Sequence, residues 1–187
     1  MNGNSKTKVV DIERLVRASQ AGDRSSFDKL VGMYQRQAMQ VAIRILDDAD
    51  GAAEAVQNGF VKAYLNIEKL KESKRFEAWF FQIITNTALS WRRAAKDRMK
   101  KMRMAGCVNQ KKISPACRES GRELQQEIKR AMLKLSKKQA QAIALFGIDD
   151  LPQDKVAEIM NCSKEAVRWH VFKARQKLKV LLKDYLE

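Results

Sequence analysis

The segment LPQDKVAEIMNCSKEAVRWHVFKARQKL, residues 151–178, decides the fold because it predicts two helices separated by a tight turn. Pro152 is well placed to begin the first helix. Asn161-Cys162-Ser163 forms the turn, and Ser163 is positioned to cap the second helix. Apolar residues then recur at spacings of three and four, as on the buried face of an amphipathic helix: Val167, Val171, Ala174, Leu178 and Leu181. The segment therefore predicts a helix-turn-helix.

The other face of the second helix is cationic and carries two large aromatic side chains. In a helix-turn-helix, the amino-terminal residues of the second helix come nearest to the bases of duplex DNA. Arg168 suits a guanine edge and Phe172 suits a thymine methyl group, while a plain solvated face with one packing aromatic is an equally open interpretation. The candidate duplex contacts are Lys164, Arg168, Trp169, His170, Phe172 and Lys173.

The charge of the chain points to a polyanionic partner. The 187 residues carry a formal net charge of +15, and 45% of them are hydrophobic, as in a globular protein. Nucleic acid is the most plausible polyanion and an anionic membrane surface is the second choice. No apolar run approaches the ~18 residues of a membrane span, and the amino terminus has no apolar signal core. We therefore expect a cytoplasmic protein without membrane insertion.

The cysteine and histidine content argues against a disulfide framework and a zinc site, and we expect no metal and no cofactor. Cys107, Cys117 and Cys162 are an odd number without close spacing, and the chain has one histidine. We expect reduced thiols, with a redox role for these cysteines left open.

The rest of the chain shows helical periodicity and no alternating strand pattern, which predicts an all-α protein. Four helices are expected, at about 11–20, over a longer segment with apolar residues from Phe27 to Ile45, at 50–66 and at 76–98. Phe76 and Phe80 are expected in the core of this bundle. Two further helices should precede the helix-turn-helix, the second of them opened by a capping box of Ser136 and Gln139.

A basic segment separates the bundle from the carboxy-terminal helices. From Arg92 to Lys112 it holds nine lysines and arginines against Asp97 alone. Beyond about Met104 apolar periodicity stops. This composition indicates a flexible linker, either a solvated tether or a strap along a phosphate backbone.

Four motifs in order resemble a bacterial sigma factor of the sigma-70 family, most closely its small extracytoplasmic-function (ECF) group. They are AGDRSSFDKLVGMY (21–34), AAEAVQNGFVKAY (52–64), FEAWFFQIITNTALSWRR (76–93) and the stretch 133–178. The resemblance implies two small helical domains joined by the linker: a four-helix region 2 bundle at 9–98 and a region 4 helix-turn-helix at 122–187. Residues 1–8 would be a flexible tail and 99–121 the linker.

The resemblance also implies partners and sites. The partners would be bacterial RNA polymerase core, promoter DNA as duplex and as melted strand, and an anti-sigma factor in some family members. Polymerase docking would fall to Glu54, Gln57 and Phe60, and capture of the melted minus-ten strand to Lys74, Arg75, Trp79 and Asn86. An asparagine amide can read a base edge, and aromatic side chains can stack on an unpaired base.

Two other functions are weighed against this one. A conventional helix-turn-helix repressor or activator would use its first bundle for a ligand or a second copy, and would bind specific duplex DNA by itself. A nucleic-acid enzyme would hold metal ions on carboxylates such as Asp47, Asp48 and Asp50, or Asp149 and Asp150. These acidic residues fall at predicted helix ends, where short acidic residues commonly cap, so we expect no enzyme.

Overall fold

A computed structural model describes residues 3–104, 120–146 and 151–185. Within these ranges the chain is helical and has no strand, which confirms the all-α prediction. The helices are α1 (Gly3–Gln20), α2 (Arg24–Leu46), α3 (Ala49–Asn66), α4 (Phe76–Met104), α5 (Ser120–Leu133), α6 (Lys137–Phe146), α7 (Gln153–Met160) and α8 (Lys164–Leu181). Short 3-10 turns lie at Ile67–Lys69, Ser73–Arg75 and Lys183–Tyr185.

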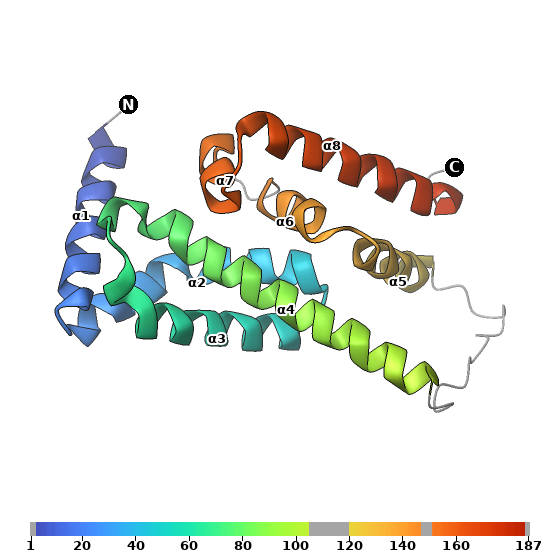
Figure 1. Cartoon of the computed structure of the whole chain (residues 1–187), viewed down its shortest axis with the longest axis horizontal. Coiled ribbons are helices and arrows are strands. Elements are labelled where there is room, and N and C mark those ends of the chain that lie inside the picture. Colours follow the sequence, from blue (N-terminus) through green and yellow to red (C-terminus); the bar gives the residue numbers. More distant parts are fainter. Residues whose placement is uncertain (1–2, 105–119, 147–150, 186–187) are drawn as a thin grey trace.

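Helices α1 to α4 form the first bundle, with α4 lying across α2 and α3 (Figure 1). Its core is aromatic: Tyr34 of α2 packs against Phe76, Phe80 and Phe81 of α4 at ring-centroid distances of 5.6 to 6.0 Å. Phe76 and Phe80 are almost fully buried, as the sequence predicts. Gly59 lets α3 approach α4, because a Cβ there would lie 2.5 Å from Cδ1 of Ile84.

Two helices extend further than the sequence predicts. α1 begins at Gly3 rather than near Asp11, and α4 continues to Met104 rather than ending near Arg98. The extension of α4 takes in the first residues of the expected linker, because this lysine- and arginine-rich stretch has good helix formers and no glycine or proline before Gly106. Most of that linker, with Cys107 and Cys117, lies outside the described residues, as do Asp149 and Asp150.

Helices α5 to α8 form the second helical group, and it packs against the first. Helices α6 and α7 contact α4, and Figure 1 shows α8 on the side of this group away from α3. The predicted capping box opens α6: the backbone N–H of Gln139 donates to Oγ of Ser136 (3.3 Å), and the Ser136 N–H donates to Oε1 of Gln139 (2.9 Å). The buried apolar residues of the two helical groups belong to one continuous hydrophobic core.

Candidate nucleic-acid interface

The turn between α7 and α8 is built from the predicted residues. Asn161 ends α7 in the left-handed conformation (φ 49°), and its N–H donates to the carbonyls of Ala157 and Glu158. Ser163 then caps α8, its hydroxyl accepting from the N–H of Ala166 at 3.2 Å. These two caps fix the angle at which α8 leaves the turn.

α8 has one buried and one exposed face. Val167, Val171 and Ala174 are buried against α6 and α7, as predicted. Trp169 and Phe172 are 54% and 55% exposed on the other face. Because large aromatic side chains gain little from water, two of them among cations indicate a surface that another molecule covers.

The first turn of α8 is held by α7. Nε of Arg168 donates to Oε1 of Gln153 at 3.2 Å, and Nζ of Lys164 lies 2.6 Å from Oδ1 of Asp154. Lys173 stands 5.8 Å from the centroid of the Phe172 ring and donates to Gln176. These cations and the two aromatic rings are therefore brought together on one side of α8.

His170 has a different environment from its neighbours. Its ring packs edge-on against Trp169 at 5.0 Å, and its Nδ1 is buried without a hydrogen-bond partner in the described part of the chain. Burial, with a smaller contribution from the charge of Lys138, lowers the pKa of His170. The imidazole is thus neutral at pH 7, and it supports the Trp169 ring from the side.

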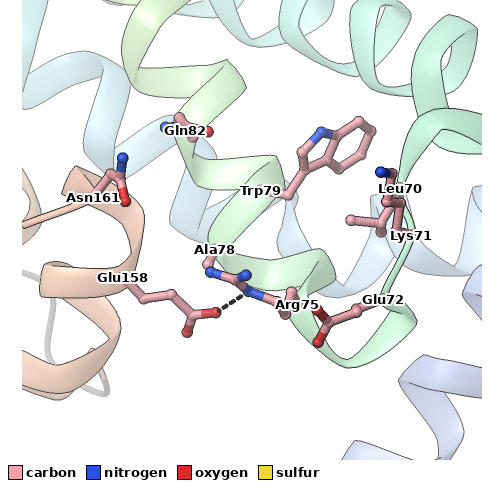
Figure 2. A pocket seen from close by; sticks show the side chains of 9 residues that line it. All are labelled: Leu70, Lys71, Glu72, Arg75, Ala78, Trp79, Gln82, Glu158 and Asn161. Atoms are coloured by element: carbon pink, nitrogen blue, oxygen red, sulfur yellow. Dashed lines mark hydrogen bonds and ion pairs between the residues drawn. The ribbon is translucent and has the colours of Figure 1, made fainter.

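A second candidate site lies where α4 begins. Arg75 and Trp79 line a pocket of about 330 Å³. Figure 2 shows them together with Leu70, Lys71 and Glu72 of the preceding segment. Arg75 and Trp79, two of the four residues predicted to contact the melted DNA strand, are thus brought together. Lys74 instead points to Glu72, with 3.8 Å between Nζ and Oε2, and Asn86 is exposed further along α4.

The remaining wall of this pocket comes from α7, which sequence reasoning missed. Glu158 and Asn161 line it (Figure 2), and Nε of Arg75 donates to Oε1 of Glu158 at 3.1 Å. Lys155 lies 3.2 Å from Glu158 and 4.0 Å from Glu77. Burial would raise the pKa of Glu158, but hydrogen bonds from Arg75 and Lys155 outweigh it and lower that pKa. No pattern in the sequence signals that α7 and α4 meet.

A third surface is the exposed side of α3. Glu54 and Gln57 are exposed, whereas Phe60 is partly buried with its ring 4.9 Å from that of Phe80. Two further apolar side chains on this side were not predicted, Val61 and Leu65, which are 51% and 70% exposed. Their signal was present, because positions 54, 57, 61 and 65 recur at helical spacing on one side of α3.

The acidic residues between α2 and α3 occupy helix cap positions. Asp47 is the carboxy-terminal cap of α2 in a left-handed conformation, and Asp48 occupies the amino-terminal cap position of α3. Across the described ranges, no group of three or more histidine, cysteine or acidic residues could hold a metal ion. Within the same ranges no helix is both long and apolar enough to cross a bilayer.

Fold and surfaces together define an all-helical protein with a helix-turn-helix at one end, an exposed cationic and aromatic face on α8, and a pocket between the start of α4 and α7. Residues 30–98 match the Sigma-70 region 2 family, and residues 125–178 match the Sigma-70, region 4 family. The chain belongs to the sigma-70 family, in its ECF group. It functions as a sigma factor, which binds RNA polymerase and directs promoter recognition.

Curated relatives agree with this assignment. The chain is 26% identical to the ECF RNA polymerase sigma factor SigW of Bacillus subtilis, over 92% of this chain and 97% of the relative. It is 29% identical to the ECF RNA polymerase sigma-E factor of Escherichia coli K12, over 87% and 89%.

Two solved structures share the fold. CnrH in complex with the cytosolic domain of CnrY superposes with a TM-score of 0.66 at 21% identity, covering 93% of this chain and 98% of that one. The sigma factor RpoE of Bartonella quintana, in complex with the anti-sigma factor NepR, gives 0.57 at 24% identity, covering 84% and 96%.

Proposed function

We propose that three surfaces of this sigma factor divide the work of initiation. The exposed side of α3 docks on core RNA polymerase, the pocket at the start of α4 captures the melted minus-ten strand, and α8 reads the minus-thirty-five duplex. The observation that carries the proposal is the face of α8, where Trp169 and Phe172 stand more than half exposed among lysines and arginines.

Duplex reading falls to the amino-terminal half of α8. Arg168 presents a guanidinium, which suits the two acceptors of a guanine edge, and Phe172 suits a thymine methyl group. Trp169 and Lys164 flank them, and Lys173 lies beside Phe172. His170 supports this surface through Trp169 rather than donating a charged contact, because its pKa is lowered.

Strand capture falls to the pocket of Arg75 and Trp79. Arg75 supplies a cation for a phosphate, and Trp79 supplies an aromatic platform on which an unpaired base can stack. Asn86 is exposed on the same helix, where its amide can read the edge of a neighbouring base, and Lys74 adds a cation at the pocket's entrance loop.

Polymerase docking falls to Glu54 and Gln57, extended by the exposed apolar side chains of Val61 and Leu65. Phe60 supports this docking surface from the core side of α3, because its ring packs on Phe80 and holds α3 against α4. An apolar stripe with a polar end is typical of a protein interface rather than of a solvated helix.

The division into domains at 9–98 and 122–187, joined by residues 99–121, is part of this proposal. So are a cytoplasmic location, an action without covalent chemistry, and control by an anti-sigma factor. Two solved structures support the last point, because RpoE, a protein of this fold, is bound there to the anti-sigma factor NepR, and CnrH is bound to the cytosolic domain of CnrY.

Binding to core polymerase tests the proposal. The purified chain should co-elute with bacterial core RNA polymerase from a sizing column at about one to one, without DNA. Leu65→Asp should weaken co-elution, because it places a charge in the apolar stripe, whereas Glu68→Gln on the adjoining loop should leave it unchanged. If the chain fails to bind core polymerase yet binds specific duplex DNA tightly by itself, it is an ordinary repressor or activator.

A further inference from the structure

The contact between the first bundle and the helix-turn-helix group is a built interface. Nε2 of Gln141 on α6 donates to Oγ1 of Thr85 on α4 at 3.1 Å, and both side chains are at most 4% exposed. The hydroxyl of Thr85 in turn donates to the carbonyl of Phe81 at 2.8 Å. Because a buried polar group is costly without a partner, a matched pair across an interface indicates one specific arrangement.

Arg92 adds a second buried link. Its side chain is 8% exposed and donates to the carbonyls of Met132 and Leu135, where α5 ends. A cation there complements the exposed carbonyls at a helix carboxy terminus. Burial lowers the pKa of Arg92, yet an arginine keeps its charge, so its partners must satisfy it. The two groups are therefore locked at two points along α4.

At the amino-terminal end of α4, the same interface supplies one wall of the pocket proposed for the melted DNA strand. The carboxylate of Glu158 lies on Arg75 at 3.1 Å, and Asn161 lines the pocket beside it. Figure 2 shows both residues reaching from α7 toward the helix that carries Trp79. A carboxylate is an oxyanion, as a DNA phosphate is, and arginine binds both with the same donors.

We propose that this closed arrangement is a self-inhibited state, in which α7 narrows access to the pocket for the melted strand and Glu158 takes the position of a DNA phosphate on Arg75. The inference rests on the proposed role of Arg75 and Trp79 in strand capture. The exposed face of α8 is not covered, since Trp169 and Phe172 remain open. The free chain can thus meet duplex DNA, but it must separate α7 from α4 before it can hold a melted strand.

The contacts between α4 and the second helical group differ in how strongly they stabilise the closed arrangement. The Arg75 and Glu158 side chains are 55% and 25% exposed, so this pair contributes little and exchanges readily with a competing anion. The buried links at Thr85 and Arg92 contribute more, because breaking them leaves polar groups without partners. The melted strand competes with Glu158 for Arg75, so its binding favours the open arrangement, because a ligand shifts an equilibrium by its differential affinity for the two states.

Binding of single-stranded DNA to the free, full-length chain tests the inference. The probe is a fluorescein-labelled single-stranded 12-mer pool of random sequence, measured by anisotropy without polymerase. Glu158→Gln should raise the affinity by roughly 1.5-fold to fivefold, the range expected for loss of one exposed ion pair. Glu123→Gln makes the same change of charge at an exposed position of α5 and should give a much smaller gain. Trp79→Ala added to Glu158→Gln should abolish the gain.

A charge swap tests the closure itself by small-angle X-ray scattering. Glu158→Arg places a cation against Arg75 and should enlarge the radius of gyration, whereas Glu158→Arg combined with Arg75→Glu should restore the compact value. The inference is overturned if Glu158→Gln gains no more than Glu123→Gln, or if Glu158→Arg stays as compact as the natural chain.

Failure of the inference is separable from failure of the proposed function. In the assembled polymerase holoenzyme, Trp79→Ala should reduce promoter opening whether or not the free chain is closed. Normal opening by Trp79→Ala would overturn the role of the pocket, and with it the inference.

Discussion

Arg168 is the side chain whose role in base reading can be tested most directly. Its Nε is held by Gln153 at 3.2 Å, which orients the guanidinium at the start of α8. If it pairs with one guanine, Arg168→Ala should weaken promoter recognition at one or two base pairs by about 1–3 kcal/mol. Holoenzyme binding to a set of singly substituted promoters measures this effect.

Lys179 provides the contrast for Arg168. It lies in the last turn of α8, away from the bases in the expected docking geometry, and is exposed. Lys179→Ala should therefore weaken all promoters alike and reduce the salt dependence of binding. An equal loss on every duplex with Arg168→Ala would make Arg168 a phosphate contact as well.

His170 should make the stability of the fold depend on pH below neutrality. Burial and Lys138 lower its pKa in the folded chain, so the unfolded chain takes up a proton first as pH falls from the ordinary value of 6.5. Stability from the neutral ring is complete above that value and is lost as pH falls toward the folded pKa. The chain has one histidine, so its NMR titration is unambiguous.

The comparison variant for His170 is His170→Gln, which cannot titrate. Urea unfolding at pH 7.5 and pH 5.5 should show a larger loss of unfolding free energy for the natural chain than for His170→Gln. A ring that titrates at or above its ordinary pKa would contradict the buried placement of Nδ1.

At the scale of the helices, one buried hydrogen bond joins α4 and α6. Its donor and its acceptor should differ in the cost of their removal. The Thr85 proton is used by the carbonyl of Phe81, so Gln141 must offer its amide N–H to the Thr85 oxygen. Thr85→Val leaves that buried N–H without an acceptor and should cost about 1–3 kcal/mol of unfolding free energy. Gln141→Leu leaves only an acceptor unused and should cost less.

The double variant completes this thermodynamic cycle. Thr85→Val with Gln141→Leu removes both polar groups, so its cost should fall clearly below the sum of the single costs. Denaturant unfolding of the four proteins measures the cycle. Additive costs would mean that the two side chains do not form the buried bond across the interface.

The helices and their buried faces could be predicted from the sequence because periodicity records which side of a helix meets the core. The stripe from Val167 to Ala174 and the caps at Ser163 and Ser136 are local patterns, and the structure has them as expected. The start of α1 and the end of α4 were wrong by several residues, since good helix formers continue past the apolar pattern.

The packing of α7 on α4 could not be predicted, because it depends on contacts between residues far apart in the chain. Thr85, Gln141 and Arg92 look like ordinary polar residues of amphipathic helices, and only the assembled fold buries them. The pocket at Arg75 was predicted only in part. Arg75 and Trp79 follow from a local motif, whereas Glu158 and Asn161 reach the pocket through the packing of distant segments.

For the chain as a unit, closure should depend on pH through Glu158. Hydrogen bonds from Arg75 and Lys155 outweigh burial and lower its pKa in the closed arrangement, so the closed chain binds fewer protons than the open one. The contribution of Glu158 to closure is therefore complete above the ordinary pKa of 4.5 and is lost as pH falls through the lowered value. Glu77 of α4 also faces Lys155.

We predict that the natural chain and the Glu158→Gln variant differ in affinity for single-stranded DNA at pH 7 and that this difference disappears at low pH. At pH 7 the Glu158→Gln variant should bind single-stranded DNA more tightly than the natural chain, because only the natural chain keeps a carboxylate on Arg75. As pH falls below 4.5 the two affinities should converge, since a protonated Glu158 resembles glutamine in charge and shape. Effects of Glu77 and of general acid destabilisation occur in both proteins and cancel in the ratio of affinities. Anisotropy titrations at pH 7 and at the lowest pH where circular dichroism shows both chains folded measure the ratio; a ratio that does not change would show that the Glu158 charge does not hold the pocket closed.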